Sequence, residues 1–434
     1  MPTISEGFTA GGESSLAFSV HRWRALAYNN FVLTERLEFT PERDAEIFSA
    51  VPSAPAVFLL RSSDAQAEPY VSKTANLRRR LHRLLGPPEE RTKKLNLRDR
   101  IRWIEYAPTG SDFESGFILY RVLRSTFPKT YTKRLRFRFA PLIKLHLENE
   151  YPRASMTTRL GRLDGRSLYY GPFQSRAAAE KFMNDSLDFF KMRRCVDDLH
   201  PDPAFPGCIY SEMKMCLAPC FKGCSDEEYS GEVGRVQKYF DSRGESLLAE
   251  MSQQREAASA NLAFEEAAAI HQRLEKLKSI VNQLPEIVRR LDRLSALMIQ
   301  PSALPNSVTF FRVDKASIYG PASFCIQTAE HAKSQSLESR VQEALDNFQP
   351  AKSSALETME HLALLRRWFY RGRPVGELFV ADEKGTLPMR RIVRGIGRVF
   401  RGERPEVGND EPLRGLKVEE VPDSGTEVSK QSDL

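Results

Sequence analysis

The chain has 434 residues, a formal net charge of +7 and a sequence pI near 9.0. This length suffices for two or three domains with separate cores, and the excess of Lys and Arg favours an anionic partner. No apolar run reaches the ~18 residues of a membrane span, and the first residues lack the basic start and apolar segment of a secretory signal. We therefore expect a cytoplasmic protein without a membrane partner.

The charge is clustered along the chain. Residues 73–102 hold eleven Lys or Arg against three acids, and residues 121–138 hold seven against none. Residues 403–434 are acidic and rich in Pro, Gly and Ser, a composition that cannot bury enough apolar area to offset ordering entropy. We expect that tail to be disordered and the two basic regions to contact the partner.

The first predicted domain covers residues 51–140 and follows an N-terminal extension of residues 1–50. "VFLLR" (57–61) and "PYVS" (69–72) are predicted strands joined by a polar hairpin, and a third strand follows at residues 100–108. A helix capped by Asp112 comes next. This order of elements predicts an α+β fold with a small antiparallel sheet.

A short basic helix follows the second of these strands. Its leucines, at i, i+4, i+7 and i+8, form one apolar stripe that must face the sheet; they are Leu77, Leu81, Leu84 and Leu85. At about 100° per residue, Arg80 borders the stripe, whereas Arg79 and Arg83 point away from it. Such a helix is often only a solvated surface, but Arg78, Arg79 and Arg83 are also candidates for binding DNA phosphates.

The segment 124–139, "RSTFPKTYTKRLRFRF", alternates cations with aromatic residues. This pattern suits contact with a phosphate backbone and stacking on bases, and it makes Arg134, Arg136 and Arg138 candidate DNA-binding residues. An alternating strand, with Phe137 and Phe139 facing inward, explains the pattern equally well.

Five of the six cysteines lie in the next region, residues 141–225. Cys195, Cys208, Cys216 and Cys220 have the spacing C-x12-C-x7-C-x3-C in a proline-rich segment. In a reducing compartment such a cluster indicates a metal site rather than disulfides, and four thiolates can close a tetrahedral site. The spacing alone does not distinguish Zn²⁺ from an iron-sulfur cluster.

The remaining sequence is helical and then mixed. Residues 226–297 are strongly helical, and residues 298–402 alternate between strand and helix patterns whose fold the sequence does not identify. "MRRIVRGIGRVFRG" (389–402) is basic and amphipathic, although its two internal glycines weaken a helix. It suggests an auxiliary contact with nucleic acid or a membrane surface.

Taken in order, "AVFLLR…PYVSKTANLRRRL", "ESGFILY", "YYGPFQSRAAAEKF", the cysteines and the helical segment resemble the UvrC family of excinucleases over about residues 50–290. The first of these motifs resembles its GIY-YIG nuclease domain. The resemblance implies DNA as partner and nucleotide excision repair as function. Full-length members add a ribonuclease-H-like and a helix-hairpin-helix domain, which we expect this shortened chain to lack.

Three catalytic positions of the nuclease domain are kept and four are changed. The resemblance implies that Tyr70 helps to activate water and that Lys73 and Arg80 stabilise the phosphate. The changed positions are Phe58, Ser72, Tyr120 and Thr132. Tyr120 stands where the family has its metal-binding glutamate, and tyrosine is a poor ligand for Mg²⁺. This substitution leaves binding of Mg²⁺ or Mn²⁺ at the nuclease site doubtful.

The resemblance implies two further sites. It favours an iron-sulfur cluster on the four cysteines, with Zn²⁺ as the alternative. It also makes "LAFEEAAAIHQRLEKLKSIV" (262–281) a UVR motif, a helical hairpin that binds a UvrB-like protein. Its candidate contact residues are Leu262, Phe264, Ala267, Ala268, Ile270, Leu274 and Leu277.

Three functions remain open from the sequence. The chain is a DNA-binding and docking protein of excision repair with a silent nuclease domain, an active endonuclease with an altered metal site, or a DNA-binding regulator that senses metal or redox state. The side chain at residue 120 divides the first two, because cleavage needs a metal or an equivalent charge at the scissile phosphate.

Overall fold

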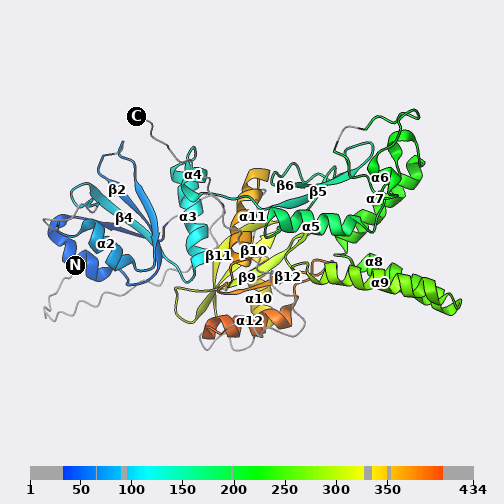
Figure 1. Cartoon of the computed structure of the whole chain (residues 1–434). Coiled ribbons are helices and arrows are strands. Elements are labelled where there is room, and N and C mark those ends of the chain that lie inside the picture. The colour runs from blue at the N-terminus through cyan, green and yellow to red at the C-terminus, as the bar shows by residue number, and fades with distance from the viewer. Residues whose placement is uncertain are drawn as a thin grey trace, which may run out of the picture.

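The structure is a computed structural model that describes residues 33–64, 66–88, 95–196, 199–326, 335–348, 353–372 and 374–403. It is an α+β fold, as predicted, and the described part contains three four-stranded antiparallel sheets (Figure 1). Most of the predicted N-terminal extension and nearly all of the acidic tail lie outside the described residues.

The N-terminal sheet has the strand order β1-β4-β2-β3. Its strands are β1 (Glu35–Glu38), β2 (Ala56–Ser62), β3 (Tyr70–Thr74) and β4 (Ile101–Pro108). Helices α1 (Asp44–Ala50) and α2 (Leu77–Leu85) cover one face, and α3 (Asp112–Thr126) packs on the other. The three strands and two helices predicted between residues 57 and 126 are confirmed, but the predicted cap of α3 is wrong, because Ser111 and not Asp112 caps it. The predicted boundary at residue 51 is wrong, because β1 and α1 belong to this same unit.

Helix α2 forms as its sequence predicts. The Asn76 side chain accepts a hydrogen bond from the Arg79 amide and so caps the first turn. All four leucines of the stripe are buried against the sheet, and Arg79 and Arg83 are exposed on the other side. Burial of the stripe therefore fixes which arginines reach solvent.

The second sheet has the order β6-β5-β7-β8 and carries the region of the cysteines beside it. Its strands are β5 (Leu142–His146), β6 (Arg153–Thr157), β7 (Leu168–Gly171) and β8 (Arg289–Arg290). Helix α5 (Arg176–Leu187) packs on it. The chain continues through α6 (Ile209–Glu212) and α7 (Asp226–Asp241), and then forms the predicted helical hairpin from α8 (Glu245–Ala260) and α9 (Phe264–Asn282). In Figure 1 this hairpin projects away from the sheets.

The region after residue 295, whose fold the sequence did not identify, is a sheet with helices on both faces. The strand order is β11-β10-β9-β12. The strands are β9 (Ala296–Pro301), β10 (Ser307–Asp314), β11 (Ser317–Cys325) and β12 (Glu377–Val380), and the helices are α10 (Leu337–Asp346), α11 (Ala355–Phe369) and α12 (Met389–Arg401). Helix α11 packs on one face, and α10 and α12 pack on the other.

The basic segment 124–139 does not form a strand. After the end of α3 it contains the short helix α4 (Tyr131–Leu135), and Arg136 ends this helix in the left-handed conformation, at φ 50°. The aromatic and basic side chains of this segment nevertheless point in different directions, as predicted. Phe137 packs edge-on against the Tyr120 ring, with ring centres 5.7 Å apart, whereas Arg136 and Arg138 are exposed.

Helix α3 joins the N-terminal sheet to the rest of the protein. Ile118 and Val122 pack on the N-terminal sheet, whereas Phe117 and Tyr120 belong to the large core that includes α11. In Figure 1 the helix stands between the N-terminal sheet and the sheet of β9–β12. No helix in the described part of the chain is both long and apolar enough to cross a membrane.

Candidate functional site

Tyr70 and Arg80 contact each other on the face of the N-terminal sheet that α2 covers. Arg80 Nη2 donates a 2.7 Å hydrogen bond to the Tyr70 hydroxyl. Phe58, on the neighbouring strand, is fully buried, and its ring centre is 6.0 Å from that of Tyr70. This arrangement holds a phenol oxygen and a guanidinium together at a partly buried position.

Lys73 lies on the opposite face of β3, because successive side chains of a strand alternate. Its Nζ is 2.5 Å from Asp112 Oδ1, and Asp112 Oδ2 accepts a 2.6 Å hydrogen bond from Arg371, just beyond α11. Burial opposes ionisation of Asp112, but the bonds to Lys73 and Arg371 lower its pKa. Lys73 is therefore committed to a carboxylate that also contacts the C-terminal region.

Tyr120 lies in a buried hydrogen-bonded cluster that we call the α3–α11 cluster: Tyr120, Arg124, Tyr131, Glu357 and Glu360. The Tyr120 hydroxyl donates to Glu360 Oε2 over 2.8 Å, and the Tyr131 hydroxyl donates to Glu360 Oε1 over 2.6 Å. Arg124 donates to the Tyr120 hydroxyl over 2.9 Å and pairs with Glu357 at 2.5 Å. Tyr120 is 1% exposed and Glu360 is fully buried.

The environment of this cluster keeps the tyrosines neutral. Burial and the adjacent Glu360 raise the pKa of Tyr120, and the same two causes raise the pKa of Tyr131 to about 12. His361, next to Glu360 in sequence, is buried against the Tyr120 and Phe117 rings, and burial lowers its pKa to about 3. The cluster thus connects α3 to α11 through one buried carboxylate, which accepts hydrogen bonds from two neutral hydroxyl groups and has a guanidinium group nearby.

Other carboxylates near α3 are also used in the structure. Glu114 is buried at the start of α3 and accepts a hydrogen bond from the Gly110 amide; burial raises its pKa to about 7. Glu105 on β4 pairs with Arg61. Across the described residues, no group of three or more His, Cys, Asp or Glu side chains is placed to hold a metal ion. Among the described residues, the α3 region therefore shows no metal-binding group that could take the place of the glutamate that the resemblance implies at position 120.

The predicted catalytic positions are divided among three places. Tyr70 and Arg80 form one pair, Lys73 belongs to the ion pair with Asp112, and Tyr120 belongs to the α3–α11 cluster. Ser72 and Thr132, the remaining changed positions, are partly buried. Because these side chains lie in three separate places, they do not form a single centre for cleavage. Tyr70 and Arg80, which lie beside α2, are still compatible with binding a phosphate.

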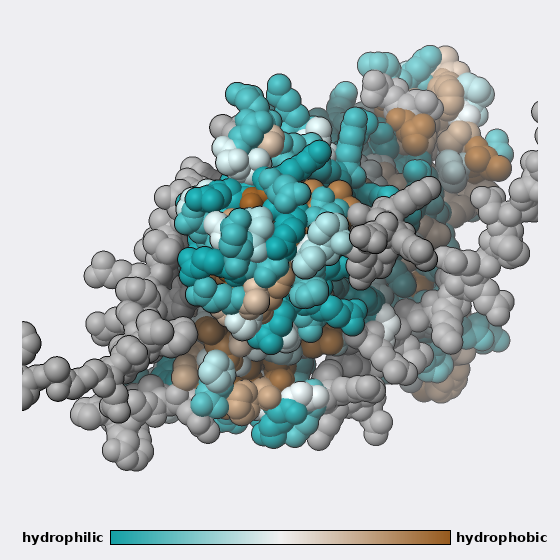
Figure 2. All heavy atoms as spheres, turned by 90° about the vertical axis from the view of Figure 1, so that its left-hand side faces the viewer, coloured by the Kyte–Doolittle hydropathy of each residue, from teal (hydrophilic) through white to brown (hydrophobic). Residues whose placement is uncertain are grey.

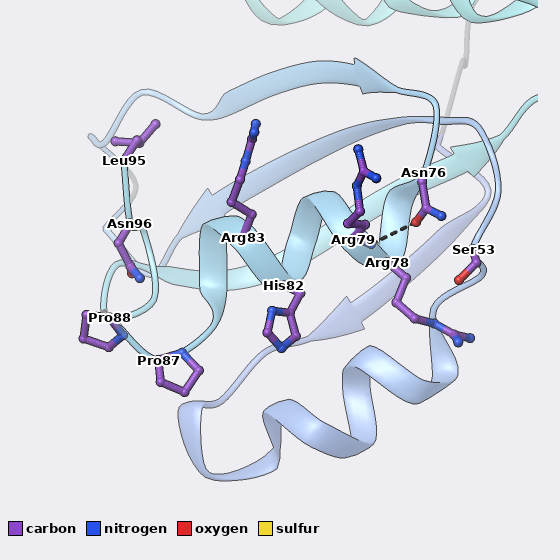
Figure 3. A pocket seen from close by; sticks show the side chains of 10 residues that line it. All are labelled: Ser53, Asn76, Arg78, Arg79, His82, Arg83, Pro87, Pro88, Leu95 and Asn96. Carbon is purple, nitrogen blue, oxygen red and sulfur yellow. Dashed lines mark hydrogen bonds between the residues drawn. The ribbon is translucent and has the colours of Figure 1, made fainter. Parts of the chain in front are cut away.

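A groove of about 480 Å³ runs along the outer side of α2 (Figure 3). Figure 3 shows Arg79 and Arg83 extending in the same direction from successive turns of the helix. Asn76 and Asn96 add polar side chains to the lining, and His82 lies between the two arginines in sequence. This groove offers two exposed guanidinium groups, with amide donors beside them, to an anionic ligand.

Arg78 differs from its two neighbours. Its Nε donates to the Val51 carbonyl over 2.8 Å and its Nη2 donates to the Ser49 carbonyl over 3.0 Å. These carbonyls belong to the end of α1, so Arg78 ties α1 to α2. Among the described residues Arg79 and Arg83 have no ion-pair partner, which makes them the better phosphate ligands. Figure 2 shows this end of the molecule as mainly hydrophilic.

The arginines of the second basic segment, residues 124–139, are also partly engaged in contacts within the chain. Arg134 pairs with Glu68 and lies 4.0 Å above the Phe127 ring, so it holds α4 against the N-terminal sheet. Arg136 and Arg138 are exposed and have no ion-pair partner in the part of the chain that is described. Of the three predicted DNA-binding arginines here, these two are available to a ligand.

The four cysteines lie in one loop-rich region, and all are partly buried. Arg193, itself buried, donates to Cys195 Sγ over 3.3 Å, and the Ala218 amide donates to Cys216 Sγ over 3.3 Å. Burial, with smaller effects of the three other thiols, raises the pKa of Cys216 to about 11. The donor set suits a soft metal or an iron-sulfur cluster. In the described part of the chain, these cysteines do not form a group of three or more ligands placed to hold a metal ion.

The predicted docking residues of the helical hairpin fall into two groups. Leu274 and Leu277 are buried, and Ile270 packs against the core. Leu262 and Phe264, at the tip, are 73% and 65% exposed, and Ala268 is also exposed. Leu262 has a φ of 57°, a conformation that leucine rarely adopts. The surface available to a partner is therefore the tip, and the lower part of the stripe holds the hairpin on its own chain.

Comparisons with known proteins match the central part of the chain. Residues 140–239 match the family described as UvrC/Cho excinuclease, middle domain, and residues 245–280 match the UvrB/uvrC motif. These two stretches of the chain are similar to the UvrC family. The second match covers α8 and most of α9, so the hairpin is similar to the UvrB/uvrC motif.

Curated relatives agree with this assignment. The chain is 27% identical over 230 residues to "UvrABC system protein C" of Rickettsia bellii, covering 53% of this chain and 35% of that protein. The protein of the same name from Carboxydothermus hydrogenoformans is 28% identical over 232 residues, covering 53% and 37%. That from Dehalococcoides mccartyi is 23% identical over 286 residues, covering 66% and 46%.

The chain thus spans less than half the length of these UvrC relatives. No solved structure matches the chain. The nuclease-like interpretation of the N-terminal sheet rests on its residues and strand order, and it stays a prediction.

Sequence reasoning missed Glu360 and Arg371. They follow Tyr120 and Asp112 by 240 and 259 residues, and no local periodicity connects positions so far apart. The only signal was a pair of acids, Glu357 and Glu360, within the apolar segment of α11. An acid there indicates a buried partner but does not identify it.

We predict that Tyr120→Glu destabilises the protein. The new carboxylate would lie beside Glu360 in a buried site, where an uncompensated charge typically costs about 3–5 kcal/mol. Tyr120→Phe loses only the hydroxyl contact, with an expected cost of about 1.5–3 kcal/mol. Urea unfolding of both variants measures the difference. Equal stability of Tyr120→Glu and the native protein would contradict the buried cluster.

Proposed function

We propose that this chain is a UvrC-like protein of the nucleotide excision repair type that binds DNA through its N-terminal domain without cutting it there. The observation that carries the proposal is the hydrogen bond from Tyr120 to Glu360. The residue at the family's metal position serves as a contact between α3 and α11. Phosphodiester cleavage then lacks the metal that would stabilise the developing charge.

DNA binding does not depend on that metal. Arg79 and Arg83 line the α2 groove, and Arg136 and Arg138 are exposed on the segment after α4. Exposed guanidinium groups release condensed counterions when they meet phosphates, and this contribution is independent of DNA sequence. The net charge of +7 adds long-range attraction.

We predict that Arg79→Gln/Arg83→Gln weakens binding to duplex DNA about tenfold at moderate salt. Each exposed charge contributes about 0.7 kcal/mol, and the two together about 1.4 kcal/mol, which equals a factor of ten. Fluorescence anisotropy with a labelled duplex measures the affinity. Arg166→Gln/Arg176→Gln is the matched control, because it removes the same charge from exposed positions elsewhere.

A nicking assay distinguishes DNA binding from DNA cleavage. Incubation of supercoiled plasmid with the native protein and Mg²⁺ or Mn²⁺ should give no nicking above that of Tyr70→Phe. Metal-dependent nicking that Tyr70→Phe abolishes would overturn the silent domain and favour an endonuclease with an altered metal site. Failure of the native protein to bind any DNA would overturn the proposal as a whole.

We also propose that the hairpin tip docks a UvrB-like protein. The matched family motif is named for both proteins. Leu262 and Phe264 are exposed apolar side chains on a projecting hairpin. The left-handed backbone at Leu262 ends α8, since the Leu262 amide donates to the Ser259 carbonyl and the Ala263 amide to the Ala258 carbonyl. Burial of such a pair by a partner would contribute several kcal/mol, since each side chain contributes about 1.5–3 kcal/mol.

We predict that Leu262→Asn/Phe264→Ser weakens binding to purified UvrB by at least tenfold and leaves the melting temperature unchanged. Asn suits the left-handed position, so the backbone is retained. Leu304→Ser removes an exposed leucine from another part of the chain and serves as the control. Isothermal titration calorimetry gives the affinity. Unchanged binding of the double variant would exclude the tip as the docking surface.

We further propose that Cys195, Cys208, Cys216 and Cys220 hold an iron-sulfur cluster, with Zn²⁺ as the alternative. In support, four free cysteines lie within one segment of 26 residues, and the buried Arg193 donates a hydrogen bond to Cys195 Sγ. Such a centre would stabilise a region with little regular secondary structure.

We predict that anaerobically purified protein contains iron and sulfide and absorbs in the visible range, and that Cys216→Ser abolishes both signals. Cys224→Ser should leave them unchanged, since Cys224 lies outside the proposed set. Elemental analysis together with absorbance provides the measurement. A colourless protein that contains zinc would replace the cluster by Zn²⁺, and a protein without bound metal would overturn the site.

A further inference from the structure

Helix α12 (Met389–Arg401) is the most sharply divided helix of the C-terminal region. At 100° per residue, its five arginines fall within an arc of about 100°; they are Arg390, Arg391, Arg394, Arg398 and Arg401. Ile392, Ile396 and Val399 fall on the opposite side and are buried. One face of the helix is thus basic and the opposite face apolar.

The apolar face is already covered by the chain itself. Ile392, Ile396 and Val399 belong to a core with strands β9, β10 and β12. Gly395 allows the close approach, because a Cβ there would lie 2.3 Å from the Phe379 ring. A membrane surface requires such an apolar face to insert between lipids, so this helix is not available for that role.

One of the arginines holds the helix in place, and a second forms a local ion pair. Arg398 makes two hydrogen bonds to Glu377 on β12, of 2.8 and 2.7 Å, and the Glu377 side chain is 6% exposed. Arg401 pairs with Glu403 just beyond the helix end. The bidentate pair between α12 and β12 fixes the rotation of the helix and therefore the direction in which its other arginines point.

The three remaining arginines are exposed. Within the described ranges Arg390, Arg391 and Arg394 have no ion-pair partner, and the acids of the neighbouring helix α10 do not pair with them. Arg390 and Arg394 are one turn apart, about 6 Å along the axis. One DNA strand carries a phosphate charge every ~3.4 Å along its axis, so both guanidinium groups can meet the same backbone. Three fixed cations at this spacing match a phosphate backbone.

We propose that α12 is a second DNA-binding surface that contacts the phosphate backbone through Arg390, Arg391 and Arg394. It lies outside the parts of the chain that match the UvrC middle domain and the UvrB/uvrC motif. The proposal rests on the proposed DNA binding and extends it to another part of the molecule, because Figure 1 places α12 on the sheet of β9–β12 and α2 on the N-terminal sheet.

The experiment measures the salt dependence of binding between the full chain and a labelled 30-base-pair duplex, a length of roughly three helical turns. In Arg390→Gln/Arg391→Gln/Arg394→Gln, the slope of log K against log salt should become shallower by about 2–3 units, at ~0.9 per phosphate contact. The corresponding triple Lys variant keeps the charge and should keep the slope. Circular dichroism should be unchanged in both, since the three side chains are exposed.

The outcomes separate this proposal from the proposed function. If the triple Gln variant binds like the native protein while Arg79→Gln/Arg83→Gln binds more weakly, the α12 surface is excluded and DNA binding by the N-terminal domain stands. If the triple variant loses affinity only for vesicles containing anionic lipid, the proposal is likewise overturned. If the native protein binds no duplex, both proposals fail together.

Discussion

The burial of α3 on two sides is the constraint on which the rest of the structure depends. One face of this helix completes the N-terminal sheet, and the other face meets α11. Polar side chains can be buried between α3 and α11 because they form hydrogen bonds and ion pairs with one another. The two oxygens of Glu360 accept hydrogen bonds from Tyr120 and Tyr131, and Arg124 pairs with Glu357. A buried carboxylate without such donors would cost more than the contact contributes. The N-terminal and C-terminal sheets are therefore parts of one framework.

This constraint separates phosphate binding from phosphate cleavage. A metal at position 120 would need an open carboxylate and room for water, whereas the structure has a buried phenol whose hydroxyl is occupied. The arginines on α2 are unaffected, because the leucine stripe directs them to the opposite side of the N-terminal sheet. The ion pair of Lys73 with Asp112 and Arg371 shows the same trend, since a residue that the resemblance predicts to contact phosphate joins two parts of the chain.

Local patterns predicted local structure well. The leucine stripe of α2, the strands around "VFLLR" and "PYVS", and the hairpin of α8 and α9 all follow from periods of 3.6 or 2 within a few residues. The sequence also identified residue 120 as the position that divides a silent nuclease domain from an active one, and this stays a prediction. It did not indicate Glu360, because the partner comes from a helix 240 residues away. For the same reason the predicted boundary at residue 51 is misplaced: β1 pairs with β4, a strand about 70 residues later. The glycines of α12 predict a weakened helix, whereas Gly395 permits its packing against Phe379.

DNA binding requires a less precise arrangement of side chains than DNA cleavage does. This difference explains why, in the proposed function, the chain binds DNA without cutting it. Several exposed arginines bind a polyanion through summed long-range attraction, which changes little if one side chain moves by an ångström. Cleavage needs a metal, a nucleophile and a phosphate aligned within about 0.5 Å. In the proposed function, α11 occupies the face of α3 that bears residue 120, and that alignment is absent. The outward surfaces of α2, of the segment after α4 and of α12 tolerate the change, because each is fixed by apolar burial on its own inner side.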